Sequence, residues 1–271
     1  MAITSFIPQV WSARLQQNLH KSLVFGALCN RNYEGDITQW GDTVHINALN
    51  DVTVKSYTPG AELADPEQLT GTDTVLSIDH GAYYNFYLND VDAAQARADL
   101  MDAAMRNAAY QLASDAELYI LQTIRSESAV KNSVSMPTVE NGKLYELLLD
   151  IKTSFDTAGV PRHDRKLIIP PSLESMLLMD NRFITGSAAA ATNLAEGSIA
   201  RAVGFDIYVS NELDDEIVAM IPDAVTFANQ ITKVEAYRPE KGFCDGLKGL
   251  CLSGAKVLIP NAVAVFTLTS V

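Results

Sequence analysis

Residues 91–125 read VDAAQARADLMDAAMRNAAYQLASDAELYILQTIR. Ala, Leu, Met, Gln, Glu and Arg dominate this stretch, and these residues lose little conformational entropy in a helix. It contains no Gly or Pro that would interrupt the backbone hydrogen bonds. Asp90 or Asp92 can cap the first turn, because a carboxylate accepts from the free backbone N–H groups there. The stretch therefore predicts one uninterrupted helix.

This predicted helix is longer than an ordinary domain is wide. At about 1.5 Å per residue it measures roughly 50 Å, against a diameter of roughly 26 Å for a compact 100-residue domain. We call it the spine helix and expect it to cross the molecule. A helix in an ordinary bundle is the alternative that the pattern leaves open. The apolar stripe consists of Met101, Met105, Ala108, Leu112, Ala116, Ile120 and Ile124.

The composition is that of a folded, non-secreted protein. With 271 residues, 48% of them hydrophobic, the chain can form one large domain or two ordinary ones. No apolar run reaches the roughly 18–20 residues that span a bilayer, and the N-terminus lacks a signal-peptide pattern. We therefore expect no membrane association. Cys29, Cys244 and Cys251 form no CxxC pair and are expected to be buried thiols in a reducing compartment.

The net charge of -13 is unevenly distributed. Residues 1–32 contain three basic residues and no acidic one, whereas residues 33–90 contain ten acidic residues and the single base Lys55. A chain this acidic is a poor general DNA binder, because phosphate repulsion opposes non-specific contact. Solubility explains much of the acidity.

Residues 1–32 are expected to form an extended arm followed by a short amphipathic helix. Trp11, Leu15, Leu19 and Leu23 recur at a spacing of four, with Val10 beside Trp11, which gives the arm one apolar face. That face can dock on the chain's own core or on a neighbour, and the sequence leaves both open. The candidate assembly contacts in the arm are Phe6, Trp11 and Leu15.

Residues 33–90 are strand-like and are expected to form one long two-stranded hairpin. Val44, Ile46 and Ala48 alternate with polar residues, and a second strand pattern runs from Thr74 to Leu88. The segment between them is polar, acidic and interrupted by prolines. An isolated hairpin is marginally stable in water, so this one requires a partner surface. Candidate assembly contacts at its tip are Pro59, Glu62 and Glu67.

The rest of the chain mixes helices and strands without regular alternation, which predicts an α+β fold. Residues 126–137 are expected to be a polar linker. Helices are predicted at 142–158 and 172–179. Strands are predicted at 166–169 and 204–210, two more within 218–228, and the last ones at 231–237 and 249–259, before an apolar tail at 263–268.

The motifs of common enzymes are absent from the sequence. It contains no GxGxxG, GxxxxGKS/T, GxSxG or HExxH pattern. His20, His45, His80 and His163 are scattered, and none is spaced from a Cys as in a metal site. We therefore assign no catalytic, cofactor-binding or metal-ligating residue and expect that the protein is not an enzyme.

Several segments, taken in order, resemble the major capsid (coat) proteins of tailed bacteriophages, which have the Hong Kong 97-type fold. The resemblance covers essentially the whole chain. It rests on FIPQVWSARL (6–15), NRNYEGDI (30–37), GDTVHI (41–46), MDAAMRNAAY (101–110), VGFDIYVSN (203–211) and GLCLSGAKVLIP (249–260).

The resemblance implies five regions in an α+β capsid fold. These are an N-terminal arm (1–32), an extended β-hairpin loop (33–90), the spine helix with a peripheral-domain helix (91–162), an axial domain (163–225), and peripheral-domain strands with the C-terminus (226–271). It further implies self-assembly into pentamers and hexamers of an icosahedral head that encloses double-stranded DNA without sequence-specific binding. The extended loop would lie over one neighbour and the arm would brace another. Many modest contacts would then stabilise the shell by multivalency.

The same resemblance implies a set of partners and a location. A portal and a decoration protein belong to such heads, which are assembled in the host cytoplasm as the shell of the virion. The family's type member carries a long N-terminal scaffolding segment that is removed by proteolysis. Here the arm begins almost at Met1, so we expect either a separate scaffolding protein or an already mature chain. Lys55 is expected to face water and not to form a covalent link between subunits.

Two alternatives stay open at this point. An encapsulin-like compartment shares the fold and encloses enzymes, but such proteins begin with a cargo-docking helix, and residues 1–32 resemble phage arms more. An α+β enzyme would require a catalytic constellation that these residues do not supply.

Overall fold

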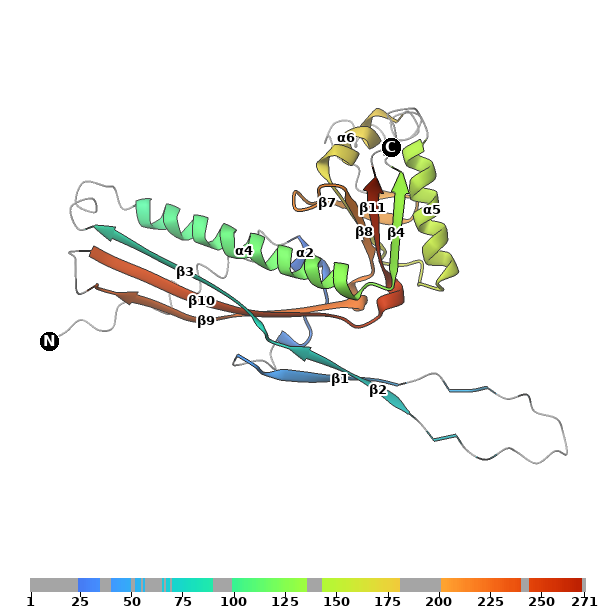
Figure 1. The fold of residues 1–271 in the computed structure, drawn as a ribbon, viewed down its shortest axis with the longest axis horizontal. Coiled ribbons are helices and arrows are strands. Elements are labelled where there is room, and N and C mark those ends of the chain that lie inside the picture. Colours follow the sequence, from blue (N-terminus) through green and yellow to red (C-terminus); the bar gives the residue numbers. More distant parts are fainter. Residues whose placement is uncertain are drawn as a thin grey trace.

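The computed structural model describes residues 24–34, 40–49, 52–54, 56, 65, 67–68, 70–89, 99–135, 143–180, 201–239 and 244–269. These residues form two bodies and a projecting hairpin (Figure 1). One body is a long three-stranded sheet with a helix along it, and the other is a six-stranded sheet flanked by two helices. The mixture confirms the predicted α+β class.

The first body is built on the spine helix, α4 (Asp99–Glu127), which lies along the three-stranded sheet (Figure 1). The strand order is β3 (His80–Asn89), β10 (Cys244–Val257) and β9 (Val225–Tyr237), all antiparallel. The 29 residues of α4 make a rod of about 43 Å. Its buried face is rich in small residues, which lets the helix approach the strands closely. The buried residues are Met105, Ala109, Leu112, Ala113, Ala116, Ile120, Leu121 and Ile124.

The predicted spine helix is thus confirmed over residues 99–127, and residues 91–98 lie outside the part that the structure describes. The helix packs on a sheet, so the alternative of an ordinary helical bundle is wrong.

The second body is a sheet ordered β4-β11-β8-β5-β7-β6. Its strands are β4 (Val130–Ser135), β11 (Val263–Thr269), β8 (Glu216–Met220), β5 (Lys166–Ile169), β7 (Phe205–Val209) and β6 (Arg201–Ala202). The helices α5 (Lys143–Thr157) and α6 (Pro171–Met179) flank it (Figure 1). Phe155 of α5 meets Phe205 of β7 edge-on, with ring centroids 5.6 Å apart.

One prediction about this body needs correction. The segment predicted as a polar linker, 126–137, contains the end of α4 and the edge strand β4, which pairs in parallel with β11 through backbone hydrogen bonds. The six-stranded body also includes α5 and β11, which come from opposite sides of residues 163–225 in the sequence. The pairing of β4 with a strand more than 120 residues later is a non-local contact that sequence order does not show.

The predicted hairpin is shorter at its root than expected. β1 (Thr43–Leu49) pairs antiparallel with β2 (Gly71–Ser77), from Thr43 opposite Ser77 to Leu49 opposite Gly71. The second strand was expected to continue to Leu88, but the chain leaves the hairpin after Ser77 and β3 pairs with β10 instead. The reason is a small buried cluster at this point, formed by Leu76, Ile78, Ala228 and Leu252.

Among the residues that the structure describes, the hairpin contacts the first body through this root. Ile78 exchanges backbone hydrogen bonds with Gly41 and Asp42, both of 3.1 Å. Gly254 of β10 faces the end of β2 so closely that a Cβ there would overlap the Ser77 carbonyl oxygen. In Figure 1 the ribbon of β1 and β2 extends away from both bodies.

The described end of the predicted arm packs on the chain's own core. The short helix α2 (Phe25–Leu28) places Phe25, with no exposed surface, in the main cluster. The buried carboxylate of Glu117 in α4 accepts from the Val24 N–H. Asn30 forms an isolated parallel bridge with Thr226 in β9. Residues 24–30 therefore join the arm to the first body.

Candidate assembly surfaces

Of the predicted contact residues, Glu67 is the one that the structure describes. Its carboxylate accepts hydrogen bonds from the backbone N–H of Thr53 at 3.1 Å and from the Thr53 hydroxyl at 3.3 Å. Glu67 therefore holds the two sides of the hairpin together beyond the β1–β2 ladder. Phe6, Trp11, Leu15, Pro59 and Glu62 lie outside the described residues.

Apolar side chains are exposed along the described outer part of the hairpin. Val54 is 94% exposed and Val52 is 60% exposed. The face of the hairpin that carries Val44 and Ile46 is half-buried, because these residues pack against the root cluster. The hairpin thus offers an apolar surface that its own described chain does not cover.

A second surface lies on the three-stranded sheet and was missed from the sequence. We call it the outer sheet face; its residues are Tyr83, Asn85, Tyr87, Lys233, Glu235, Lys248 and Leu250. Alternate side chains of β3, such as Tyr84 and Phe86, pack on the core, so Tyr83 and Tyr87 point the other way. Tyr83 is 77% exposed and Tyr87 is 65% exposed. In the sequence of β3, HGAYYNFYLN, aromatic residues occupy both odd and even positions. This pattern could have indicated that both faces of the strand carry aromatic side chains.

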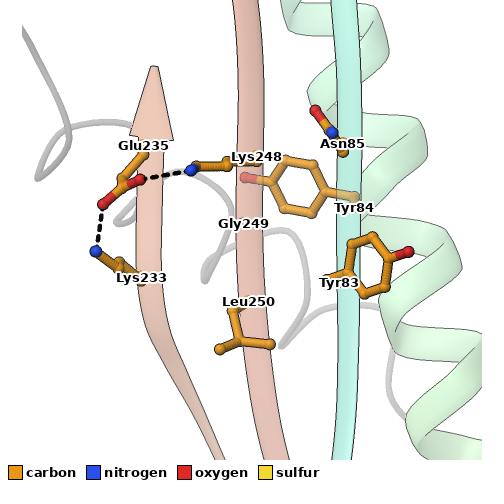
Figure 2. A pocket seen from close by; sticks show the side chains of 8 residues that line it. All are labelled: Tyr83, Tyr84, Asn85, Lys233, Glu235, Lys248, Gly249 and Leu250. Carbon is orange, nitrogen blue, oxygen red and sulfur yellow. Dashed lines mark ion pairs between the residues drawn. The ribbon is translucent and has the colours of Figure 1, made fainter. Parts of the chain in front are cut away.

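The two lysines on the outer sheet face are both paired with its one glutamate. Figure 2 shows Glu235 between Lys233 and Lys248, and the Lys248 amine is 2.9 Å from the carboxylate. Hydrogen bonds from Lys233 and Lys248 lower the pKa of Glu235 to about 2. The Lys248 amine also lies 5.5 Å from the centroid of the Tyr237 ring. The Tyr237 hydroxyl donates to Asn85 at 2.7 Å.

Between these side chains lies a cavity of about 310 Å³. Tyr84 lies across Gly249 in Figure 2, where any side chain on the neighbouring strand would collide with its ring. Burial raises the pKa of Tyr84 to about 12, and its hydroxyl has no hydrogen-bond partner among the described residues. The lining is mainly apolar, so the arrangement is suited to contact with another protein surface. It offers no nucleophile activated by a neighbouring base.

The described ranges contain no group of three or more His, Cys, Asp or Glu residues that could hold a metal ion. His45 donates to Asp73 at 2.7 Å on the exposed hairpin, and His80 donates to Asp115 at 2.7 Å. Within the same ranges, no helix is long and apolar enough to cross a membrane.

Comparison with known proteins decides the family. The family model for phage capsid protein matches residues 42–261, which include the hairpin, the spine helix and strands of both sheets. The chain belongs to this family. The capsid protein is therefore a structural protein of the virion shell and not an enzyme. The shell is built from many copies of this chain. No curated protein sequence matches it.

Solved structures agree with this assignment. A protein of Mycobacterium phage Che8 is similar with a TM-score of 0.76 and 27% identity, covering 98% of each chain. The capsid of cyanophage P-SCSP1u is similar with a TM-score of 0.70 and 17% identity, covering 100% of this chain and 91% of that one. The predicted Hong Kong 97-type fold is confirmed.

The same fold is found outside phages. A virus-like particle from Pyrococcus furiosus is similar with a TM-score of 0.60 and 14% identity, covering 96% of this chain and 98% of that one. A likeness at this identity shows the fold alone. The family match favours a phage head over the alternative of an encapsulin-like compartment.

Proposed function

We propose that this major capsid protein forms the pentamers and hexamers of an icosahedral phage head that encloses double-stranded DNA. The observation that carries the proposal is the hairpin, whose described part projects from the first body and contacts it at the root. A two-stranded ribbon is marginally stable alone in water. Its exposed Val52 and Val54 are covered when the hairpin lies over a neighbouring copy.

The outer sheet face is the surface on which such a neighbour rests. Its exposed tyrosines and Leu250 form an apolar strip, and its lysines are already paired with Glu235. Desolvating paired charges costs less than desolvating isolated ones. Repetition of modest contacts around a ring then gives a stable capsomer.

The acidic character of the chain fits a container for DNA. A net charge of -13 keeps packaged duplex from adhering to the protein, so that the DNA is enclosed without sequence-specific binding. A separate scaffolding protein sets the shell size, a portal occupies one vertex, a decoration protein covers the outside, and assembly occurs in the host cytoplasm. Production of the chain alone is then expected to give particles of mixed diameter, and co-production with the scaffolding protein a single diameter.

The decisive experiment removes the tip, residues 59–70. Circular dichroism of the deletion variant is expected to be near that of the parent, and electron microscopy and light scattering are expected to show no closed particles. Replacement of the same residues by a Gly-Ser segment of equal length separates the effect of sequence from that of loop length. Normal particles from both variants would show that the tip is a solvated loop and overturn the proposal.

A point substitution tests the same contact more gently. Val54→Asp leaves the folded subunit within about 0.5 kcal/mol, since Val54 is exposed there, and is expected to reduce particle yield strongly. Val54→Thr is similar in shape to the parent and uncharged, so its particle yield is expected to lie between those of the parent and of Val54→Asp. A denaturing gel of purified particles distinguishes the compartment alternative, which expects a second, cargo protein beside the 29.4 kDa chain.

A further inference from the structure

The hairpin and the first body are joined by a two-residue link, Ile78 and Asp79. β2 ends at Ser77 and β3 begins at His80, so this link sets the direction in which the hairpin leaves the molecule (Figure 1). Ile78 is buried in the root cluster, which is apolar throughout. Apolar contacts are non-directional and tolerate small rotations. The root cluster alone therefore holds the hairpin without fixing its angle.

Directional side-chain contacts with the spine helix are supplied by the next two residues, Asp79 in the link and His80 at the start of β3. The Tyr119 hydroxyl donates to Asp79 Oδ1 at 2.7 Å, and His80 Nε2 donates to Asp115 Oδ2 at 2.7 Å. The His80 ring is stacked on the Tyr119 ring, with centroids 4.3 Å apart and an interplanar angle of 12°. Asp115 and Tyr119 are four residues apart, so they lie on one face of α4.

These contacts differ from the root cluster in their exposure to water. His80 is 28% exposed and Asp115 is 45% exposed, so water can replace their hydrogen bond at low cost. On the other side of the link, the Ser77 hydroxyl donates to Asp79 Oδ2 at 3.4 Å. The contacts of Asp79 with Tyr119 and of His80 with Asp115 thus tie the link and the start of β3 to one rigid helix, and they remain able to open.

We propose that Asp79, His80, Asp115 and Tyr119 form a latch that sets the angle of the hairpin to the spine helix. The hairpin can rotate about the buried cluster around Ile78, and the contacts among the four polar and aromatic side chains restrain this rotation. A closed latch presents the hairpin in one direction before it meets a neighbouring copy. An open latch lets the hairpin rotate as the shell forms. This inference rests on the proposed role of the hairpin in assembly.

The test measures the hairpin angle in unassembled subunits of the full chain. Spin labels are attached to Val54→Cys on the hairpin and Gln122→Cys on the spine helix, both at exposed positions. The native cysteines are buried and do not compete for the label. With the latch intact, double electron–electron resonance is expected to give a single narrow distance peak.

The latch is opened by Tyr119→Phe together with Asp115→Ala, which removes the hydrogen bond from the spine helix to Asp79 and the one to His80 and keeps the stacked rings. The narrow peak is expected to be lost, with the thermal unfolding temperature of the subunit nearly unchanged. Asp79→Asn keeps an acceptor for Tyr119 and is expected to retain the peak. If the double variant does not fold, Tyr119→Phe alone is expected to broaden the distribution.

A matched control exists inside the hairpin. His45 and Asp73 form an exposed pair of the same chemistry and the same 2.7 Å length, but they connect β1 with β2 and not the hairpin with the body. His45→Ala with Asp73→Ala is expected to leave the peak unchanged. An unchanged peak in Tyr119→Phe would overturn the latch. Because the measurement uses unassembled subunits, this failure is distinct from a failure to form shells.

Discussion

Gly254 in β10 leaves no room for a side chain, because a Cβ there would overlap the carbonyl oxygen of Ser77 at the end of β2. The two residues are far apart in sequence and belong to different sheets. Their contact is where the hairpin crosses the long sheet, and it explains why β10 carries a glycine at that position.

Gly254→Ala is therefore expected to displace the root of the hairpin. The obstructing atom belongs to the backbone and cannot rotate away, so we expect the overpacking cost of about 1–3 kcal/mol and a reduced particle yield. Thermal unfolding and electron microscopy measure the two effects. Gly249→Ala is the control, because the obstructing atoms there are at the far end of the Tyr84 side chain, which can move. Equal losses in both variants would contradict the explanation.

The outer sheet face gives a second prediction. Tyr83→Ser removes an exposed ring and is expected to leave the thermal unfolding of the isolated subunit nearly unchanged, while raising the protein concentration needed for assembly. Light scattering across a concentration series measures this threshold. Tyr110→Ser on the spine helix is a control of similar exposure outside that face. If the two variants assemble alike, Tyr83 is not a contact.

The buried thiols predict a shell without disulfide bonds. Burial raises the pKa of Cys29 and of Cys251 to about 12, and Cys244 is also buried. A thiol that is protonated and inaccessible does not exchange. Particles boiled in detergent without reductant are expected to run as one band of 29.4 kDa, and a thiol reagent is expected to detect the 3 cysteines only after unfolding. A ladder that reductant does not remove would point to a covalent link through Lys55.

Arg165 and Asp156 predict a pH dependence of stability in the six-stranded body. Arg165 is 2% exposed and donates to the carbonyl oxygens of Val160 and Pro161 at 2.6 and 2.7 Å. Its ion pair with Asp156, at 2.8 Å, lowers the pKa of Asp156 below its ordinary value. A lowered folded-state pKa means that the pair contributes stability above the unfolded pKa of about 4 and that this contribution is lost as the pH falls through the folded pKa.

Asp156→Asn is accordingly expected to unfold at a lower temperature than the parent at pH 7. The difference is expected to shrink and vanish as the pH falls below about 4, where the parent also loses the charge. Calorimetry from pH 7 to pH 2 measures this difference in unfolding temperature. Asp214→Asn, at an exposed position, is the control. A difference that stays constant over this range would show that it does not arise from the carboxylate charge.

Local pattern was enough to predict the spine helix, most strands and the α+β class of this protein, whereas the Hong Kong 97-type fold was implied by the resemblance to tailed-phage capsid proteins. Helix formation depends on residues three and four positions apart, so the run through Met105, Leu112 and Ile120 defines α4 without any distant partner. Strand alternation is equally local, and it identified β1 through Val44 and Ile46. The sequence also lacks the motifs of the common enzyme classes, and we therefore expected that the protein is not an enzyme.

The tertiary structure alone decided which strands pair. Nothing near Ser77 in the sequence shows that the hairpin stops there, because the competing partner of β3 is β10, more than 150 residues later. β4 was missed because a strand at a sheet edge pairs through its backbone and needs no apolar alternation. Tyr83 and Tyr87 became candidate contacts only when the pairing showed which face the core leaves free. Backbone hydrogen bonds between strands are non-local and nearly independent of the side chains. The local sequence therefore predicts where strands lie, whereas the tertiary structure determines which strands pair.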